Sequence, residues 1–186
     1  MNESDDTLVG RARRGDPGAF EVLLRRYFRA SYLVAMAQLG ERADAEDACQ
    51  DAFVKAWEQL GQCRDAARFG AWLLRIVRNS AHNRRDYLRV RRTESLDDES
   101  AVHAKGSAEE ELERRELAVA LRAALATLPP VQREIVLMHD LDEWRHARIA
   151  ALLEISEVMS RRHLSDARKQ LRALLGGRAS EEAQHD

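Results

Sequence analysis

The sequence predicts an all-α protein with two small helical domains joined by a flexible acidic linker. Of its 186 residues, 33% are charged and 5% are aromatic, and glycine and proline are sparse at 9 and 3. Such a composition favours helices over strands. Apolar residues recur at steps of three and four except between residues 93 and 107. We therefore place domains at residues 1–92 and 108–175, with a linker at 93–107 and a polar tail at 176–186.

The chain opens with a pattern typical of two helices separated by a tight break. We expect a short helix over residues 4–14, with Leu8, Val9 and Ala12 turned inward. Gly15-Asp16-Pro17 ends it, because Asp16 can cap the next helix and Pro17 suits its first position. The next helix is expected to end at Leu39-Gly40. Its apolar stripe consists of Phe20, Leu23, Leu24, Tyr27, Ser31 and Val34.

Residues 44–60, DAEDACQDAFVKAWEQL, predict a helix with one apolar and one acidic face. Asp44 is the expected N-cap and Gly61 the expected C-terminal stop. The expected buried face consists of Ala45, Ala48, Cys49, Ala52, Phe53, Ala56, Trp57 and Leu60. The opposite face is rich in acids and amides and includes Glu46, Asp47, Gln50, Asp51 and Glu58. From periodicity alone, a core helix with a solvated outer face fits this pattern.

A polar loop at residues 62–68 leads into a helix that begins as core and becomes strongly basic. Phe69, Trp72, Leu73, Ile76 and Val77 keep helical spacing, with Trp72 as a core anchor. Between residues 75 and 92 there are seven arginines and one acid. Amides and imidazole among arginines suit base edges and phosphates, so the candidate nucleic-acid residues are Arg75, Arg78, Asn79, His82, Asn83, Arg84, Arg85 and Arg89.

Helical spacing returns at residue 108. The expected inward stripe is Leu112, Leu117, Ala120, Leu121, Ala124, Leu125 and Leu128. Pro129-Pro130 ends this helix and starts another, in which Val131, Ile135 and Met138 are the expected core residues.

The last part of the chain predicts a helix-turn-helix over residues 145–175. The turn is expected at residues 154–156, with Ser156 as the N-cap of the second helix. That helix has an expected buried stripe of Leu164, Ala167, Leu171 and Leu174. Its opposite face is basic, as duplex DNA binding requires, and carries Arg161, Arg162, Ser165, Arg168, Lys169 and Arg172.

Whole-chain properties restrict the compartment and the class of chemistry. The formal net charge of −2 says little about DNA, but basic and acidic residues are segregated into blocks, which suggests different partners for different segments. Cys49 and Cys63 form no disulfide framework and suit a reducing cytoplasm. We expect a cytoplasmic protein with no membrane span, cofactor, metal or small-molecule substrate, because no apolar run, phosphate loop or metal motif occurs.

Four motifs in order resemble the extracytoplasmic-function class of bacterial RNA polymerase sigma factors. They are GDPGAFEVLLRRY at residues 15–27, the acidic helix at 44–60, FGAWLLRIVRN at 69–79 and LATLPPVQREIVLM at 125–138. The resemblance covers residues 8 to 175 and implies a promoter-specificity factor rather than an enzyme.

The resemblance assigns partners to each region. The acidic face would dock on the clamp helices of the largest polymerase subunit, and the basic helix would read the melted minus-ten strand. The loop of Cys63, Arg64, Asp65 and Phe69 would capture a flipped base. The second domain would meet the flap of the second-largest subunit and the minus-thirty-five element. An anti-sigma regulator is also implied.

The second domain departs from the family pattern at several positions. Glu143 and Glu154 stand where glycine is common in the turns, and a turn with positive φ disfavours a side chain. Arg145 replaces the usual Ser or Thr cap, Arg148 replaces a usual Glu, and Ser160 falls on the buried stripe where Val is expected. These changes affect the expected turn geometry and sequence preference more than the domain assignment.

Two other classes of protein fit part of the sequence. A free-standing helix-turn-helix regulator would explain the last helix but not the acidic helix at residues 44–60. A sigma mimic that occupies an anti-sigma protein would not need the arginines between residues 75 and 92. Catalysis is disfavoured, because the histidines are scattered and no nucleophile or acid–base constellation is present.

Overall fold

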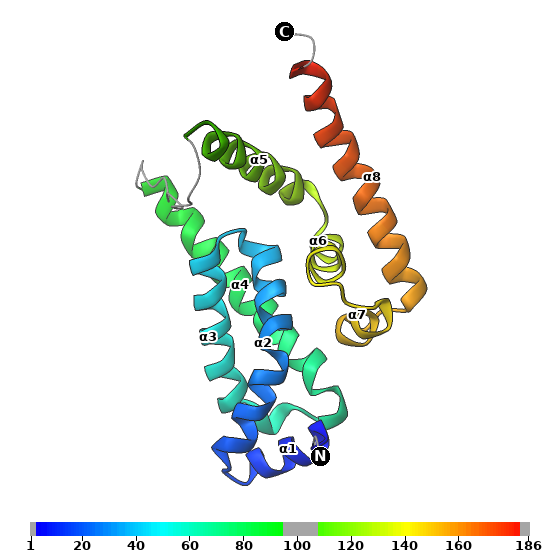
Figure 1. Cartoon of the computed structure of the whole chain (residues 1–186). Coiled ribbons are helices and arrows are strands. Elements are labelled where there is room, and N and C mark those ends of the chain that lie inside the picture. Colours follow the sequence, from blue (N-terminus) through cyan, green and yellow to red (C-terminus); the bar gives the residue numbers. More distant parts are fainter. Residues whose placement is uncertain (1–2, 95–107, 183–186) are drawn as a thin grey trace.

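The computed structural model describes residues 3–94 and 108–182, and every regular element in these ranges is a helix. The expected linker at 93–107 therefore lies almost wholly outside the described residues. Figure 1 shows the helices in two groups, the N-terminal unit (α1–α4) and the C-terminal unit (α5–α8). The N-terminal unit comprises α1 (Asp5–Arg13), α2 (Pro17–Leu39), α3 (Arg42–Glu58), the short 3-10 helices η1 (Leu60–Gln62) and η2 (Ala66–Arg68), and α4 (Phe69–Glu94).

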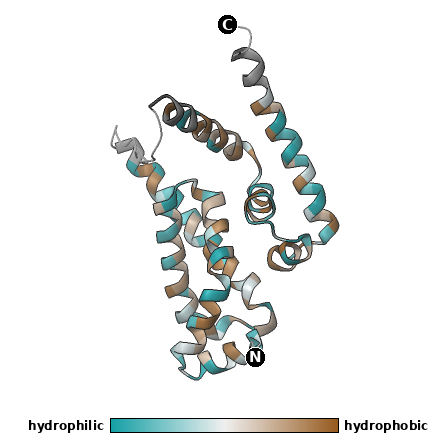
Figure 2. Ribbon diagram, viewed as in Figure 1, coloured by the Kyte–Doolittle hydropathy of each residue, from teal (hydrophilic) through white to brown (hydrophobic). Residues whose placement is uncertain are grey.

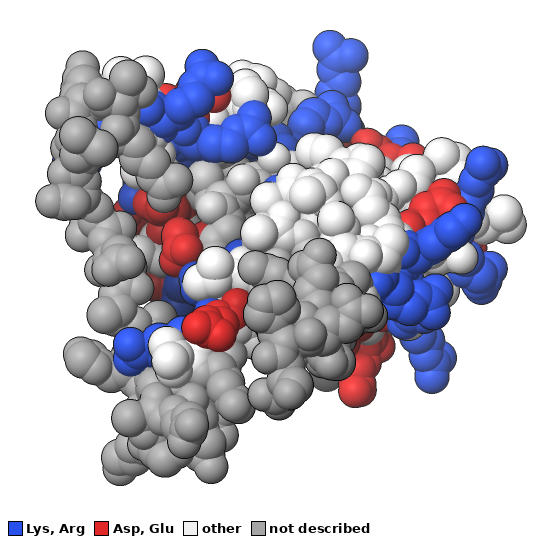
Figure 3. Space-filling model, turned by 90° about the horizontal axis from the view of Figure 1, so that it is seen from above, with Lys and Arg blue, Asp and Glu red and all other residues white. Residues whose placement is uncertain are grey.

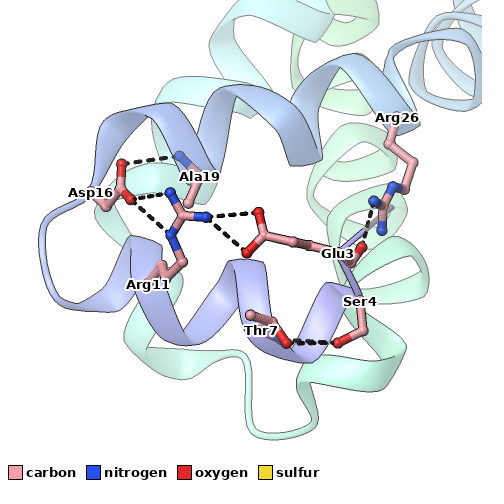
Figure 4. Close-up of polar contacts among 7 residues, drawn as sticks. All are labelled: Glu3, Ser4, Thr7, Arg11, Asp16, Ala19 and Arg26. Carbon is pink, nitrogen blue, oxygen red and sulfur yellow. Dashed lines mark hydrogen bonds and ion pairs between the residues drawn. The ribbon is translucent and has the colours of Figure 1, made fainter. Parts of the chain in front are cut away.

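Side-chain caps begin the first two helices, and Asp16 and Pro17 occupy the positions at the start of α2 that the sequence predicts. The Ser4 and Asp16 side chains cap α1 and α2 by accepting hydrogen bonds from the backbone N–H groups of Thr7 and Ala19. The Arg11 guanidinium donates hydrogen bonds to the carboxylates of Glu3 and Asp16, and so links the start of α1 to the start of α2 (Figure 4). Gly40 ends α2 with φ 76°, a backbone angle that glycine adopts without strain.

Helices α2, α3 and α4 pack against one another around one apolar core. At its centre the fully buried Phe69 ring contacts the rings of Phe20, Tyr27 and Trp72. The small residues of α3, expected on its buried face, are buried and let the helices approach closely. Lys55 crosses from α3 to donate a hydrogen bond to the Ser80 hydroxyl of α4 at 3.1 Å.

The start and end of α3 differ from the prediction. The helix begins at Arg42, so Asp44 is not the N-cap but lies in the first turn. Arg84 of α4 binds the Asp44 carboxylate at 2.7 Å, and this tertiary contact takes the side chain away from capping. The helix ends at Glu58, before Gly61, because Leu60 turns into the core within η1.

The C-terminal unit comprises α5 (Ala108–Thr127), α6 (Pro130–Val136), the π-helical turn η3 (Leu137–Leu141), α7 (His146–Leu153) and α8 (Glu157–Glu182). Pro130 occupies the first turn of α6 and Ser156 caps α8 through Met159 N–H, both as predicted. Helix α8 packs on α5, α6 and α7 and continues to Glu182, past the expected end of the domain at 175. In Figure 1 it runs along one side of the molecule.

Several residues expected in the core of the C-terminal unit lie at its surface. On α5, Leu117 is 64% exposed, and Leu112 and Leu121 are exposed beside it. Figure 2 shows α5 as a largely hydrophobic helix in its described part. Helical periodicity predicts which face of α5 is apolar but not whether a neighbour covers that face. Val131 and Leu174 were also expected in the core, and both are exposed.

The two units meet along α2 and α4 on one side and α6, η3 and α7 on the other. The contact has both apolar and polar parts, because one buried apolar cluster contains residues of both units. Its ion pairs include those of Arg29 with Asp142 and Arg122 with Glu41. Arg133 also reaches across to donate to the backbone carbonyl of Ala37. No helix within residues 3–94 and 108–182 is both long enough and apolar enough to cross a membrane.

Candidate nucleic-acid interface

The candidate nucleic-acid residues of α4 fall into two groups in the structure. One group is exposed to solvent, and we name it the α4 face: Arg75, Asn79, His82, Asn83, Arg85 and Arg89. Its members project from successive turns because α4 is one continuous helix from Phe69 to Glu94. Within it, the Arg85 guanidinium lies 2.7 Å from His82 Nδ1, which keeps the imidazole and the guanidinium side by side.

The other group consists of Arg78 and Arg84, which are held in ion pairs. Arg84 bridges Asp44 and Asp47 of α3, both at 2.7 Å, and thereby fixes α4 against α3. Arg78 donates two hydrogen bonds to Glu134 of α6, at 2.9 and 2.8 Å. Neither guanidinium is free to contact a phosphate in this arrangement. The sequence could not reveal these pairings, since the Arg78 partner lies 56 residues away.

The loop expected to capture a base is split between surface and core. Arg64 and Asp65 are exposed, and Asp65 caps η2 through Ala67 N–H. Cys63 and Phe69 are buried, at 1% and 0% exposure, so neither side chain is accessible to a base in this arrangement. Phe69 serves the aromatic core instead, because its ring is surrounded by three others.

The outer face of α3 carries the expected acidic residues and an apolar centre. Asp47, Gln50, Asp51 and Glu58 are exposed, while Glu46 is half-buried and pairs with Arg42 one turn earlier. Val54, which lies among these residues at helical spacing, is 59% exposed.

Trp57, expected in the core, is 40% exposed and contacts Phe20 with its inner edge. The sequence indicates this exposed apolar surface of α3 only through Val54, an apolar residue at an outer position of the helix. We name the set of Asp47, Gln50, Asp51, Val54 and Glu58 the α3 face.

All six candidate residues of α8 are exposed, which leaves their stripe accessible along the helix. Figure 3 shows lysine and arginine side chains gathered on the side of the molecule that carries α8, with acidic ones interspersed. Arg168 differs from its neighbours, since it makes a bidentate ion pair with Asp140 of η3. Arg161 pairs with Glu157 on its own helix.

A histidine and a serine join α7 to α8 inside the helix-turn-helix. Ser160 is fully buried, as its place on the stripe predicts, and its hydroxyl lies 2.8 Å from His146 Nδ1. The His146 ring stacks on His139, with centroids 4.6 Å apart. Burial lowers the pKa of His146, and the nearby charges of His139 and Arg161 lower it further. A neutral imidazole can pair with the hydroxyl without placing another positive charge near Arg161.

Both glutamates that replace family glycines adopt a left-handed backbone. Glu143 has φ 56° and Glu154 has φ 57°, a region in which a side chain is disfavoured. The Glu154 carboxylate pairs with both Arg68 and Arg75 of the N-terminal unit. Glu143 makes no such ion pair among the described residues. The two turns therefore have the same backbone geometry but different side-chain contacts.

The two cysteines are buried thiols rather than ligands. Burial raises the pKa of Cys49 to about 12 and also raises the pKa of Cys63. Within the described part of the chain, no group of three or more His, Cys, Asp or Glu side chains is placed to hold a metal ion.

Comparison with known proteins identifies both halves of the chain. The sequence profile of Sigma-70 region 2 matches residues 23–93, and that of Sigma-70, region 4 matches residues 118–171. Among curated relatives, the ECF RNA polymerase sigma factor SigM of Mycobacterium tuberculosis is 32% identical over 93% of this chain and 85% of that protein. The probable RNA polymerase sigma factor RfaY of Xanthomonas campestris is 35% identical over 75% of this chain and 36% of that protein.

A solved structure extends the match to three dimensions. CnrH, in complex with the cytosolic domain of CnrY, superposes with a TM-score of 0.60 and 27% identity, over 94% of this chain and 99% of that chain. Region 2 corresponds to the helices that carry the α3 and α4 faces, and region 4 to the helix-turn-helix. The chain therefore belongs to the extracytoplasmic-function RNA polymerase sigma factors.

Proposed function

We propose that this sigma factor docks on core RNA polymerase through the α3 face while the α4 face reads the minus-ten element of the melted non-template strand. The observation that carries the proposal is the placement of these two faces on adjacent helices of one core. Their inner sides pack together while their outer sides stay exposed. A single rigid unit would then fix the position of the separated DNA strand relative to the polymerase.

The α3 face suits a protein partner with basic and apolar side chains. Asp47, Asp51 and Glu58 supply negative charge for steering and orientation. Val54 at their centre, with Trp57 nearby, supplies apolar surface that a partner can bury. We assign this face to the clamp helices of the largest polymerase subunit.

The α4 face suits single-stranded DNA. Asn79 and Asn83 can pair with base edges through both an amide donor and a carbonyl acceptor. Arg75, Arg85 and Arg89 can hold the phosphates on either side. A melted strand exposes its base edges and phosphates outside any groove. A straight helix face is therefore sufficient to follow the strand.

We assign the minus-thirty-five element and the polymerase flap to the C-terminal unit. The basic stripe of α8 is the candidate for the duplex, and the exposed apolar side chains of α5 are the candidate for the flap. An anti-sigma protein is a further proposed partner, since CnrH was solved with CnrY bound. We also propose that the chain acts in the cytoplasm, where its polymerase and promoter partners lie. Sigma factors act by binding rather than catalysis.

Core binding tests the α3 face. Asp51→Lys should weaken binding of the full chain to core polymerase, because it reverses a charge at the centre of the face. Asp166→Lys, a similar reversal on exposed α8, should leave core binding unchanged. Native gel shifts measure the affinity and circular dichroism checks the fold. Equal affinity for both variants would remove the α3 face as the polymerase site.

Promoter opening tests the α4 face. Asn79→Ala in the holoenzyme should relax base preference in the minus-ten element, at a cost of about 1–3 kcal/mol for a bidentate base contact. Arg89→Ala should weaken opening evenly on all promoter variants, since phosphate contacts carry no sequence information. Permanganate footprinting on a panel of promoter variants measures both. An even loss for Asn79→Ala would contradict base reading by this residue.

A further inference from the structure

We propose that Val158, in the first turn of α8, contacts the 5-methyl group of a thymine in the major groove of the minus-thirty-five duplex. The proposal rests on the proposed function of α8, because it takes the basic stripe of this helix as the surface that binds that duplex. It adds an apolar contact with a base edge to a stripe of basic and polar side chains. Val158 thereby sets part of the promoter preference of the chain.

Val158 is an apolar side chain that stands largely uncovered. It is 72% exposed, the largest exposed fraction among the large hydrophobic residues that the structure describes. The Ser156 hydroxyl accepts a hydrogen bond from Met159 N–H at 3.1 Å, which fixes the turn from which Val158 projects. Valine has one strongly preferred side-chain rotamer in a helix, so its two methyl groups are held in one direction. The start of α8 therefore presents a small, rigid apolar surface to solvent.

The position of Val158 on α8 places it in the middle of the basic stripe. Arg162, Ser165 and Lys169 follow it by four, seven and eleven residues, a spacing that keeps side chains on one face of a helix. The buried stripe of the same helix, which contains Leu164, lies on the opposite face. When the basic stripe enters a groove of the DNA, Val158 enters with it.

The charged side chains around Val158 leave one arginine available beside it. Arg161 is paired with Glu157 on its own helix at 2.8 Å. Arg162 has an 82% exposed side chain, and its partner Asp166 lies 3.9 Å away, beyond hydrogen-bonding distance. Residues four apart on a helix have Cβ atoms about 5–6 Å apart. Arg162 can therefore bind a guanine edge or a phosphate close to the base that Val158 contacts.

An apolar side chain in the major groove has one favourable kind of partner. All four bases present hydrogen-bond donors or acceptors there, and only thymine adds a methyl group. A valine that displaces water from a polar base edge leaves that edge without a hydrogen bond, which is unfavourable. Opposite a thymine, the valine instead buries one methyl group against another. Val158 thus favours thymine and disfavours the other bases at one position.

Removal of the thymine methyl group alone should weaken binding measurably. Burial of one methyl group corresponds to about a three- to fivefold change in affinity. Deoxyuridine lacks this methyl group and keeps the same pairing with adenine. A comparison of the two bases therefore separates the proposed contact from phosphate binding, which is the same for both.

Deoxyuridine scanning of a duplex tests the contact. The parent holoenzyme first selects a duplex from a pool randomised over the minus-thirty-five element, and each thymine of the selected duplex is then replaced in turn by deoxyuridine. Competition binding measures the ratio of affinities for the thymine and deoxyuridine duplexes. It is measured for the parent holoenzyme and for holoenzymes with Val158→Ala or Val22→Ala.

The two variants are matched in chemistry and differ in place. Val158→Ala should keep the fold, because the side chain is exposed and alanine has the highest helix propensity. Val22 is 43% exposed on α2, in the N-terminal unit and away from the basic stripe. Val22→Ala therefore removes the same two methyl groups where no contact with this duplex is proposed.

The expected result is a change of ratio at one thymine. There the parent and Val22→Ala should lose about three- to fivefold in affinity when the methyl group is removed. Val158→Ala should bring that ratio close to one and leave the ratios at the other thymines unchanged. A purely structural role for Val158 predicts weaker binding to both duplexes with the same ratio. An unchanged ratio in Val158→Ala, or no thymine at which the methyl group matters, would overturn the proposal.

Failure of the thymine contact and failure of the proposed function of α8 give different results. If α8 does not bind the duplex, Lys169→Ala and Arg172→Ala leave the salt dependence of duplex binding unchanged. If these two variants flatten the salt dependence while Val158→Ala keeps the parent ratio, the proposed function stands and the thymine contact is wrong.

Discussion

Ser160 shows how one polar side chain fits into an otherwise apolar stripe. A lone hydroxyl on such a stripe would be unpaired, and replacement by valine would then stabilise the unit. The structure instead gives the hydroxyl a partner in His146 Nδ1. A pattern of apolar positions predicts that Ser160 is buried but cannot predict its partner, which lies 14 residues earlier.

Substitution of Ser160 should therefore destabilise the C-terminal unit. Ser160→Ala removes the hydrogen bond to His146 and should lower the free energy of unfolding by about 1 kcal/mol. Ser160→Val should be no more stable than Ser160→Ala, since it adds volume at a fully buried site. Urea denaturation followed by circular dichroism measures both. A gain in stability for the valine variant would show that the hydrogen bond contributes nothing.

His146 should make the stability of the C-terminal unit depend on pH. Its folded pKa is lowered by burial and by its charged neighbours, so the fold favours the neutral ring. That stabilisation is complete above the unfolded pKa of about 6.5 and is lost as the pH falls through the folded value. The urea midpoint should therefore drop between neutral pH and about pH 5. In His146→Gln, which can still pair with Ser160, the drop should be smaller; equal drops would exclude His146 as its source.

At the scale of the elements, helix ends were predictable where local chemistry sets them. Ser4, Asp16, Gly40 and Ser156 each act within one turn of their own position, so the sequence is sufficient. The start of α3 was not predictable, because Asp44 is taken by Arg84 from a helix 40 residues later.

The candidate site was predictable only in part for the same reason. Asn79, His82 and Asn83 are exposed on α4, where their spacing places them. Arg78 belongs to the same run in the sequence, yet it faces Glu134, and a pattern of charges cannot show which arginines have distant partners. The assignment of the α4 face to base reading stays a prediction.

The junction of α4 with α2 and α7 depends on Gly70. A Cβ at this position would lie 2.8 Å from Tyr27 Cζ and 2.9 Å from Leu152 Cδ2. Tyr27 cannot easily move aside, since its ring contacts Phe69 and its hydroxyl is hydrogen-bonded to Asp5.

Gly70→Ala should therefore lower stability by about 1–3 kcal/mol, the usual cost of overpacking. Gly61→Ala is the matched control, because a Cβ there meets nothing within 4 Å. Thermal denaturation of both variants gives the comparison. Similar melting temperatures for the two would show that the α4 junction can relax around the added methyl group.

The salt dependence of duplex binding should identify which basic residues of α8 contact phosphates. Lys169→Ala and Arg172→Ala should each flatten the log–log slope by about 0.9 if each side chain neutralises one phosphate. Arg168→Ala is a less direct test, because Arg168 also ties α8 to η3 through Asp140. Titrations of the holoenzyme on a minus-thirty-five duplex measure the slopes. Parallel slopes for parent, Lys169→Ala and Arg172→Ala would remove the α8 stripe as a phosphate-binding surface.

At the scale of the whole molecule, the contact between the two units should weaken when a residue outside the α4 face is changed. Arg29 of α2 binds Asp142 of the C-terminal unit, and this pairing lowers the pKa of Asp142. Arg29→Ala should shift the chain toward more extended forms without altering any residue of the α4 face. Small-angle X-ray scattering of the free chain should then give a larger radius of gyration. Arg25→Ala, an exposed change one turn away on α2, should leave that radius unchanged.

The apolar cluster that the two units share also has a calorimetric consequence. Exposure of apolar surface raises the heat capacity of a protein, whereas exposure of polar surface lowers it. The cluster contains Leu23 and Phe69 of the N-terminal unit together with Ile135, Met138 and Leu152 of the C-terminal unit. Separation of the units should therefore raise the heat capacity. A scanning calorimeter should record that separation as part of the melting of the helices.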